Sequence, residues 1–388
     1  MRFEVDWISL LSRRPRLQDC LEEVLSVSPP RGRPDLAIVF ATSAFRDDFA
    51  LIGQVQDRLG APVMIGCSAD GVIGAGLEIE GGPALSLNLG WLPGAEVRSF
   101  RVADGSNLPG PDDPPEAWQD MIGFDRSASQ ILLVDPFSDF ISHLLSGLDF
   151  AFPRAVRIGG LASGARQPDE VALFLDGDIC RNGAIGVSLS GLSINSLVAQ
   201  GCRPVGAPMV ITGCQDTNVY ELDHRPALQL LASTVAALSP DDRLLARHSL
   251  FVGLATESLS SITPEDFLIR NILGVHAPSE SIGIAAPTRR GQILQFHLRD
   301  ARASTLDLER AFSGLQPESL SQARGALLFS CLGRGQGLYG LANHESNLFT
   351  RIMPDVPLGG FFCNGEIGQI GGSTYVHGYT SCFGILSN

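Results

Sequence analysis

The chain has 388 residues, of which 44% are apolar, and a formal net charge of −14 at pH 7. This length and composition are sufficient for two hydrophobic cores, so we expect a globular protein and not a disordered one. The acidic balance argues against a nucleic-acid backbone or an anionic membrane surface as the main partner, because both carry charge of the same sign. Small molecules and other proteins remain as candidate partners.

The first residues mix acids with arginines and contain no uninterrupted apolar stretch. We therefore expect neither a secretory signal nor a membrane insertion, and we expect the protein in the cytoplasm. Residues 1–34 are interpreted as a helical extension, with a helix within residues 10–25. Eight cysteines are scattered without a C-x-x-C pair, which is typical of buried, reduced thiols and not of a disulfide framework or a zinc ribbon.

The first clear unit begins after this extension. An apolar run predicts a buried strand at Leu36–Thr42. Apolar residues at spacings of three and four then predict a helix over residues 45–59, which Gly60 ends. Residues 62–74 indicate strand, glycine turn and strand, whereas residues 103–116 are rich in Pro, Gly and Asp and are expected to form an exposed loop.

The same order returns further along the chain. A strand is predicted at residues 131–137 and a helix at 140–150, followed by a strand and glycine turn at 156–164. Residues 171–179 and 183–191 are expected to pair as a hairpin with its turn at residues 181–183.

A third passage through this order is expected to start with a strand at residues 249–255, followed by a helical or irregular segment at 266–275. A fourth passage starts with a strand at residues 325–335, continues with a helix at 344–352 and ends with strand and turn at 356–368.

Three glycine turns share one pattern: PVMIGCSADGVIG, VRIGGLASG and VPLGGFFCNGEIG. They indicate an internal repeat of strand, helix, strand, glycine turn and strand, with a diverged copy in third place. Such units cover one sheet face with a helix and need another layer on the other face. The predicted fold is α/β or α+β, with mixed β-sheets layered with helices in two similar domains. We expect the domains to span residues 35–223 and 224–388.

These motifs resemble the FIST proteins, a family named for F-box and intracellular signal transduction. The matching stretches in the N half are IGCSADGVIG, IGGLASG, GAIGVSLSG and ITGCQDTNVYELDHRPAL. Those in the C half are DFLIRNILGV, GQILQFHLRD, LLFSCLGRG and PLGGFFCNGEIG, with His377 behind them. The resemblance extends from Asp35 to Ile385 and implies a FIST N domain followed by a FIST C domain. Because no F-box-like region precedes these motifs, the ubiquitin-ligase adaptor role of some members is not expected.

The resemblance further implies an intracellular sensory module that binds small ligands, amino acids among them. Such a module signals within a larger protein or to a separate one, such as a histidine kinase. Some FIST proteins look like haem proteins that sense nitric oxide. The resemblance does not say which of these ligands is bound, so the ligand has to be inferred from the residues of the site.

The predicted ligand site centres on Arg334 and Glu366. Each directly follows an apolar run or a glycine turn, and strand ends are where ligands bind in open α/β sheets. A guanidinium and a carboxylate in one pocket could recognise the two charged groups of an amino acid. They could equally pair with each other. The neighbouring Cys331 and Asn364 are included in the predicted site.

Other candidate ligand residues lie outside this pair. Arg270 in DFLIRNILGV is either a ligand contact or a structural cap. The turns at Gly66, Cys67 and Ser68 and at Gly160 either offer free backbone N–H groups to an anion or are turns only.

Two alternative functions remain open. Haem would need an axial ligand such as His143, His297 or His377, each of which is also explained as a hydrogen-bonded core residue. An enzyme would use a cysteine at a glycine turn, which is Cys67, Cys331 or Cys363, but no P-loop, H-E-x-x-H or G-x-S-x-G motif is present. We therefore expect a sensor that is not an enzyme and binds a small polar ligand, with no metal site. The alternatives are a haem-binding nitric oxide sensor that acts on a histidine kinase and an enzyme with a cysteine at a glycine turn.

Overall fold

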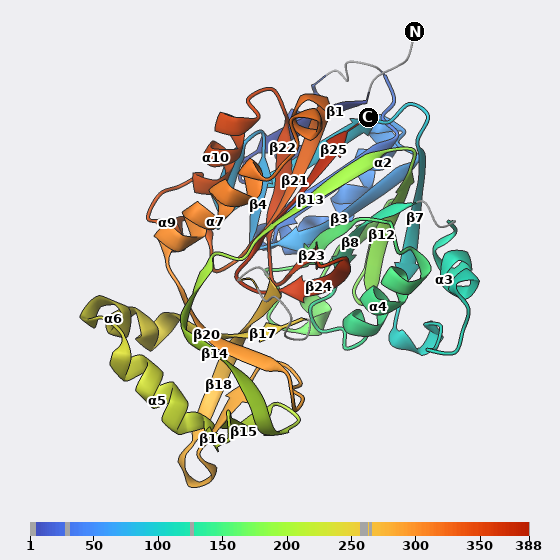
Figure 1. Ribbon diagram of the computed structural model, residues 1–388. Helices are drawn as coiled ribbons and strands as arrows, with labels where there is room; N and C mark the ends of the chain where they lie inside the picture. Colours follow the sequence, from blue (N-terminus) through green and yellow to red (C-terminus); the bar gives the residue numbers. More distant parts are fainter. Residues whose placement is uncertain (1–4, 28–31, 125–127, 257–262, 264–265, 388) are drawn as a thin grey trace. The chain divides into compact units, whose positions relative to one another are not determined.

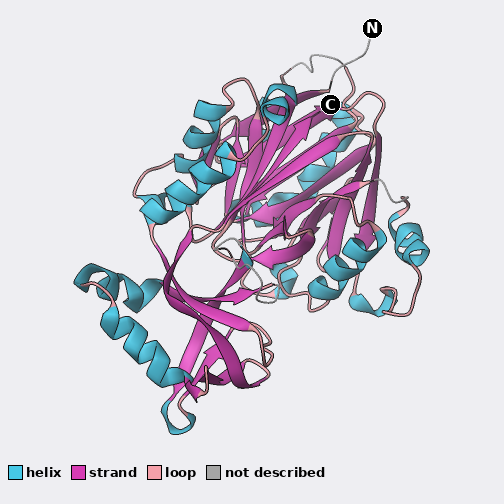
Figure 2. Ribbon diagram, in the orientation of Figure 1, coloured by secondary structure: helices cyan, strands magenta, loops and turns pink. Residues whose placement is uncertain are grey.

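The structure is a computed structural model that describes residues 5–27, 32–124, 128–256, 263 and 266–387. Mixed β-sheets are layered with helices, which confirms the predicted α/β class (Figure 1 and Figure 2). The chain divides into two compact units. The first unit comprises Met1–Val198, Ala311–Val376 and Thr380–Asn388, and the second comprises Ala199–Arg310 and His377–Tyr379.

Within the described residues, the first unit contains three six-stranded sheets that follow one plan. A central parallel pair is flanked on one side by an antiparallel strand and an edge strand, and on the other side by a hairpin. In that order, the first sheet is β1 (Asp6–Ser12), β6 (Leu85–Trp91), β2 (Leu36–Thr42), β3 (Val63–Ala69), β10 (Leu173–Leu175) and β11 (Asp178–Cys180). The second is β7 (Glu96–Val102), β12 (Ala184–Ser190), β8 (Ser129–Val134), β9 (Arg157–Leu161), β23 (Glu366–Ile370) and β24 (Ser373–His377). The third is β13 (Ser193–Ala199), β25 (Ser381–Ser387), β21 (Ala323–Cys331), β22 (Leu358–Cys363), β4 (Gly71–Gly74) and β5 (Leu77–Glu80).

Each hairpin comes from a different repeat than the parallel pair beside it. The hairpin β4–β5 follows β3 in the chain but joins β22, and β10–β11 follows β9 but joins β3. The hairpin β23–β24 follows β22 but joins β9. In Figure 1 the blue β4 accordingly lies beside the orange and red strands β21 and β22. The three repeats thus exchange hairpins in a cycle, and none of them completes its own sheet.

Helices accompany each parallel pair. The first repeat carries α1 (Leu17–Leu25), the 3-10 helix η1 (Ser43–Ile52) and α2 (Gly53–Leu59), and the second carries α3 (Pro115–Ile122) and α4 (Ile141–Ala151). The third carries α8 (Pro317–Gln322), α9 (Gly335–Tyr339) and α10 (His344–Ile352). Within the described residues, no helix is both long and apolar enough to cross a lipid bilayer.

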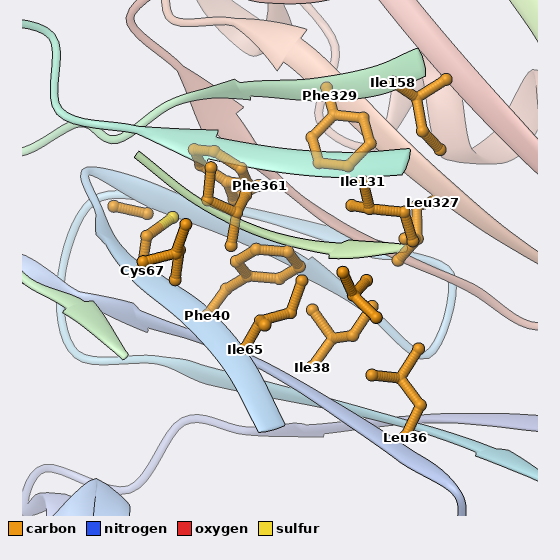
Figure 3. Close-up of a cluster of buried hydrophobic side chains, with 14 of the residues drawn as sticks. Leu36, Ile38, Phe40, Ile65, Cys67, Ile131, Ile158, Leu327, Phe329 and Phe361 are labelled. Atoms are coloured by element: carbon orange, nitrogen blue, oxygen red, sulfur yellow. The ribbon is translucent and has the colours of Figure 1, made fainter. Parts of the chain in front are cut away.

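The strand β2 shows why the parallel strands are apolar throughout. Its residues Leu36, Ile38 and Phe40 belong to the core shared by the three sheets, whereas the alternate residues pack against α1 and η1. In Figure 3 Phe40 lies against Phe361 of the third sheet, with a ring-centroid distance of 4.8 Å. Because both faces of the strand are covered, neither face can be polar.

The repeated glycine of the three turns has a packing role. Gly66, Gly159 and Gly360 each lie opposite a residue of the neighbouring parallel strand, in the same register position. A Cβ atom there would lie 2.1, 1.9 and 1.9 Å, respectively, from that residue's carbonyl oxygen. Gly159 and Gly360 also have φ values of 150° and 141°, which side-chain-bearing residues rarely adopt. Close approach of the backbones therefore explains the glycine motif without a ligand.

The second unit is an antiparallel barrel inserted in the third repeat, between β13 and β21. Its strand order is β14, β20, β17, β18, β19, β15 and β16, and a pairing of β14 with β15 closes the ring. These strands are β14 (Cys202–Gln215), β15 (Asn218–Leu222), β16 (Arg225–Pro226), β17 (Leu250–Ala255), β18 (Phe267–His276), β19 (Ser281–Ile284) and β20 (Ile293–Arg299). The helices α5 (Ala227–Ala237) and α6 (Pro240–Ser249) belong to this unit, and α7 (Ala301–Ser313) follows β20.

This insertion corrects the expected third passage. The strand expected at residues 249–255 is β17, Leu250–Ala255, whose two partners are antiparallel, so the segment is not a copy of the repeat. Residues 266–275, expected to be helical or irregular, form most of strand β18. Short apolar strands of a barrel and of a layered sheet look alike in sequence, which explains the error.

The N-terminal extension is partly a strand. Residues Asp6–Ser12 form β1 and pair with β6, and helix α1 starts only at Leu17. The prediction of a helix from residue 10 was wrong at its start because pairing with β6 overrides the local pattern. Residues 1–4 and 28–31 of this extension lie outside the described residues.

The predicted hairpin around residues 181–183 was also wrong. The tight turn lies at Asp176 and Gly177, with φ values of 47° and 89°, and joins β10 to β11. Strand β12 pairs instead with β7 and β8. Asp-Gly is a preferred sequence for such a turn, so the sequence contained the correct signal.

The glycine contact gives a direct test of the repeat. We expect Gly360→Ala to lower the free energy of unfolding by about 3 kcal/mol or more, because its Cβ would collide with the Leu328 carbonyl. The control Gly337→Ala places a Cβ where nothing lies within 4 Å, so its stability should stay near that of the wild type. Urea unfolding measures both, and equal stability of the two variants would contradict the packing role.

Candidate functional site

The carboxyl ends of parallel strands from all three repeats meet where the hairpins leave for the next sheet. Ser163, which follows β9, donates its N–H to Ser68 O at 3.2 Å and its Oγ–H to Phe362 O at 2.5 Å. The same Oγ accepts from Asp70 N–H at 2.9 Å. These bonds tie the three glycine turns together, although the turns are far apart in sequence.

A cleft of about 510 Å³ opens beside this junction. Its walls come from η1, which follows β2, from the segments that follow β3, β9 and β21, and from the loop between β5 and β6. The lining residues are Thr42, Ser43, Ala44, Arg46, Asp70, Gly82, Gly164, Ala165, Arg166, Glu170 and Leu332. The volume lies in the range of small-molecule sites.

Charged groups of opposite sign face this cleft. Arg46 is held in place, because its Nη2 donates to Gly164 O at 2.7 Å and its Nη1 lies 3.2 Å from Glu170 Oε1. The carboxylate of Asp70 and the guanidinium of Arg166 are exposed. Neither group forms a side-chain hydrogen bond or ion pair with any residue that the structure describes. The cleft therefore presents an available carboxylate and an available guanidinium.

The loop that carries Leu332 continues into a buried ionic network. Arg334 is fully buried, and its Nε donates to Glu345 Oε1 at 2.6 Å while its Nη2 donates to Tyr339 OH at 2.6 Å. Ser330 Oγ donates to Glu345 Oε2 at 2.6 Å, so both carboxylate oxygens have partners. Burial opposes both charges, but the opposite charge of its partner raises the pKa of Arg334 and lowers that of Glu345. Both side chains are therefore charged at neutral pH.

Glu366 does not pair with Arg334. Its Oε2 accepts from Thr380 N–H at 3.1 Å, and its Oε1 has no hydrogen-bond partner among the described residues. Burial raises the pKa of Glu366 well above its usual range. The corresponding hairpin positions of the other two sheets are Val72 and Leu173. A carboxyl group thus occupies a core position that is apolar in the other two sheets.

Two further carboxylates reach the third repeat from β5. Glu78 Oε1 accepts from Ser346 N–H at 2.6 Å at the start of α10, and Glu80 Oε1 accepts from Gln336 N–H at 2.7 Å in α9. Burial, followed by the charge of Glu345, raises the pKa of Glu78 to about 7. The exchanged hairpin therefore adds a titratable group to the buried network.

The predicted site residues fall into two groups. The first unit holds Gly66, Cys67, Ser68, Gly160, Cys331, Arg334, Asn364 and Glu366, at or next to the strand junction. The second group is Arg270, on β18, and His377, at the end of β24, which cluster with the second unit. Sequence neighbours of the first group, such as Asp70 and Leu332, line the cleft.

Several residues of the first group have structural contacts. Ser68 Oγ accepts from Ala172 N–H at 3.2 Å, and Asn364 N–H donates to Leu161 O at 3.0 Å. A Cβ at Gly160 would lie 2.4 Å from Cys363 Sγ. These contacts hold the junction together.

The candidate cysteines Cys67 and Cys363 lie in the core of the first unit and Cys331 lies opposite Cys363 on a paired strand, whereas the candidate histidines lie on separate elements. Burial raises the pKa of the Cys67 and Cys363 thiols well above the usual range. His143 on α4 packs edge-on against Trp118, and burial lowers the pKa of His297 on β20 to about 4. Within the described residues, no three metal-ligating side chains come together to hold an ion.

Sequence reasoning missed Arg46, Asp70, Arg166 and Glu345. Asp70 carried a signal, because it lies inside the repeated glycine turn. Arg46 lies in η1, where the spacing marks the buried apolar residues and not the arginine. Arg166 lies in a loop with no periodicity, and Glu345 is at the start of a helix, where an acidic residue is ordinary. Only the fold brings them to the junction.

Family models of two domains match the chain in succession. The FIST N domain model matches residues 35–225, and the FIST C domain model matches residues 227–369. The chain is 32% identical to an uncharacterized protein of Mycobacterium tuberculosis over 362 residues, which are 92% of either chain. It is 33% identical to an uncharacterized protein of Mycobacterium bovis over 363 residues, 91% of this chain and 90% of that one. It is 31% identical to the human F-box only protein 22 over 121 residues, 31% of this chain and 29% of that protein.

The buried ion pair predicts a pattern of stability losses. We expect Arg334→Met to lower the free energy of unfolding by about 3–5 kcal/mol, because Glu345 is left charged and unpaired in the core. Adding Glu345→Gln should restore part of this loss, since no uncompensated charge then remains at that position. Urea unfolding at pH 7 compares the two variants. A double variant less stable than Arg334→Met would be evidence against this interpretation.

The raised pKa of Glu78 predicts a pH dependence. Because the folded pKa of about 7 exceeds the ordinary value of 4.5, the folded state binds the proton more tightly. Stability should therefore fall as pH rises from 4.5 to about 7. Glu78→Gln keeps an acceptor for Ser346 and should remove this loss of stability. The variant should therefore be more stable than the wild type by about 2–3 kcal/mol at pH 8 and should differ little from it at pH 4.

Chemical unfolding at pH 4 and pH 8 measures this difference. The exposed Glu80 on the same strand provides the control, and Glu80→Gln should not change the stability difference between the two pH values. If Glu78→Gln changes the free energy of unfolding by the same amount at both pH values, burial does not raise the pKa of Glu78.

Proposed function

Because this chain belongs to the FIST family, whose domains are associated with signal transduction and sensing, we propose that it is a sensor of a small zwitterionic metabolite such as an amino acid. The ligand binds in the cleft at the junction of the three repeats. A partner protein, such as a histidine kinase, reads the bound state in the cytoplasm.

The observation that carries this proposal is the pair of available opposite charges in the cleft. Arg166 can hold a carboxylate in a bidentate manner, and Asp70 can accept an ammonium group. Arg46 adds positive charge on the same wall but already pairs with Glu170. A zwitterion satisfies both free groups at once, whereas an anion or a cation alone leaves one of them without a partner.

The network around Arg334 gives a physical route from the cleft to the core. Leu332 lines the cleft, and two residues later Arg334 is fixed by Glu345 and Tyr339. A ligand that moves this loop changes the environment of Glu366, which has a buried oxygen without a partner. In this proposal, Arg334 and Glu366 respond to the ligand, and the ligand favours one of two conformations by its differential affinity.

The buried thiols favour a binding function over catalysis. A cysteine nucleophile needs a thiolate, and burial disfavours the thiolate at Cys67 and Cys363. We therefore propose that this chain is a binding protein and not a cysteine enzyme.

The charged pair of the cleft defines the test. In a thermal-unfolding panel of amino acids, the wild type at about 100 times the dissociation constant should gain about 2.7 kcal/mol, which is a rise of several degrees in the midpoint. Asp70→Asn combined with Arg166→Gln should remove this rise. The control Asp112→Asn combined with Arg154→Gln changes the same charges at exposed positions outside the cleft and should keep it. A rise that survives in the Asp70 and Arg166 variant would place the ligand elsewhere.

A further inference from the structure

Helix α6 of the second unit has no fully buried residue. Its N-terminus is held by Ser239 Oγ, which accepts from Asp242 N–H at 3.1 Å, and by the ion pair of Asp242 with Arg203. Leu245 packs partly against the barrel core, but Leu244 is 63% exposed. A surface helix normally buries an apolar face. The outer side of α6 thus carries apolar surface that the described chain leaves uncovered.

A groove of about 630 Å³ lies along this side of the helix. Its lining consists of Val235 from α5 and five residues of α6: Pro240, Arg243, Leu244, Ala246 and Arg247. The lining is apolar except for the two guanidinium groups. The groove can therefore accept an apolar side chain between two positive charges.

The two arginines determine which partner fits. Arg243 and Arg247 are exposed and stand one helical turn apart. Neither guanidinium has a side-chain hydrogen bond or ion pair with any residue in the part of the chain that the structure describes. The nearby carboxylate of Asp242 already pairs with Arg203. The lining thus contains two arginines and no acidic residue, although the chain as a whole has a net charge of −14.

We infer that the groove between α5 and α6 is a docking site for an acidic amphipathic segment of a partner protein. An apolar side chain of that segment covers Leu244, and carboxylates one turn apart pair with Arg243 and Arg247. Complementary charge accelerates such an association and rejects partners of the wrong sign. The groove and the cleft of the first unit consist of different residues, so one proposal can be wrong while the other holds.

Synthetic peptides test the inference on the full-length protein. Three labelled peptides of about 18 residues, or five helical turns, are compared by fluorescence anisotropy. The first has leucines on one helical face with flanking glutamates, the second has lysines in place of the glutamates, and the third is a scrambled form of the first. We expect the first peptide to bind about tenfold more tightly than the other two, and we expect its affinity to fall with added salt.

Charge reversal at the groove provides the matched variants. Arg243→Glu combined with Arg247→Glu should lower the affinity for the acidic peptide by about tenfold or more, and Leu244→Ser should lower this affinity as well. Arg289→Glu combined with Arg290→Glu makes the same charge change at exposed positions outside the groove and should have little effect. Circular dichroism and thermal unfolding confirm that each variant is folded.

Four results would overturn the inference. The first is equal affinity for the acidic and basic peptides, and the second is unchanged affinity for the acidic peptide in the Arg243 and Arg247 variant. The third is binding to vesicles of anionic phospholipid that this variant abolishes. The fourth is self-association of the chain that Leu244→Ser abolishes. The third would assign the groove to a membrane surface, and the fourth to a second copy of this chain.

Discussion

The first unit depends on the exchange of hairpins among its three repeats. Each parallel pair is completed by a hairpin from another repeat, so no repeat can bury its inner face alone. The exchange requires the chain to turn out of one sheet directly after a parallel strand. It therefore brings the ends of strands from all three repeats to one junction. The cleft lies beside that junction, and its walls come from loops of all three repeats as a consequence.

The third repeat contains an ion pair, Arg334–Glu345, in which both side chains are fully buried. It also supplies Glu366, whose carboxyl group occupies a hairpin position that is Val72 or Leu173 in the other two sheets. A buried ion pair adds little net stability compared with apolar packing, so its presence calls for another explanation. The proposed sensor function supplies one, because Leu332, two residues before Arg334, lines the cleft.

The sequence predicted local features of this fold well and long-range features poorly. The strand Leu36–Thr42 and the helix His344–Ile352 were predicted to the residue, because burial on both faces and helical spacing are local signals. The hairpin exchange was not predictable, since it pairs segments from different repeats and leaves no periodic pattern. For the site, reasoning from strand ends led to Arg334 and Glu366, which stay predictions and do not line the cleft, and it missed Glu345, which lies in a helix. The cleft residues were missed because charged loop residues look the same whether they face a ligand or bulk water.

Amide hydrogen exchange of the full-length chain, with and without the amino acid that stabilises it most, tests the central claim most directly. A ligand held at the junction should slow exchange in three segments that are far apart in sequence: residues 68–71, 163–166 and 330–334. The account predicts protection in all three at the same ligand concentration, because all three build one cleft. Protection confined to one segment, or to the barrel of the second unit, would contradict it.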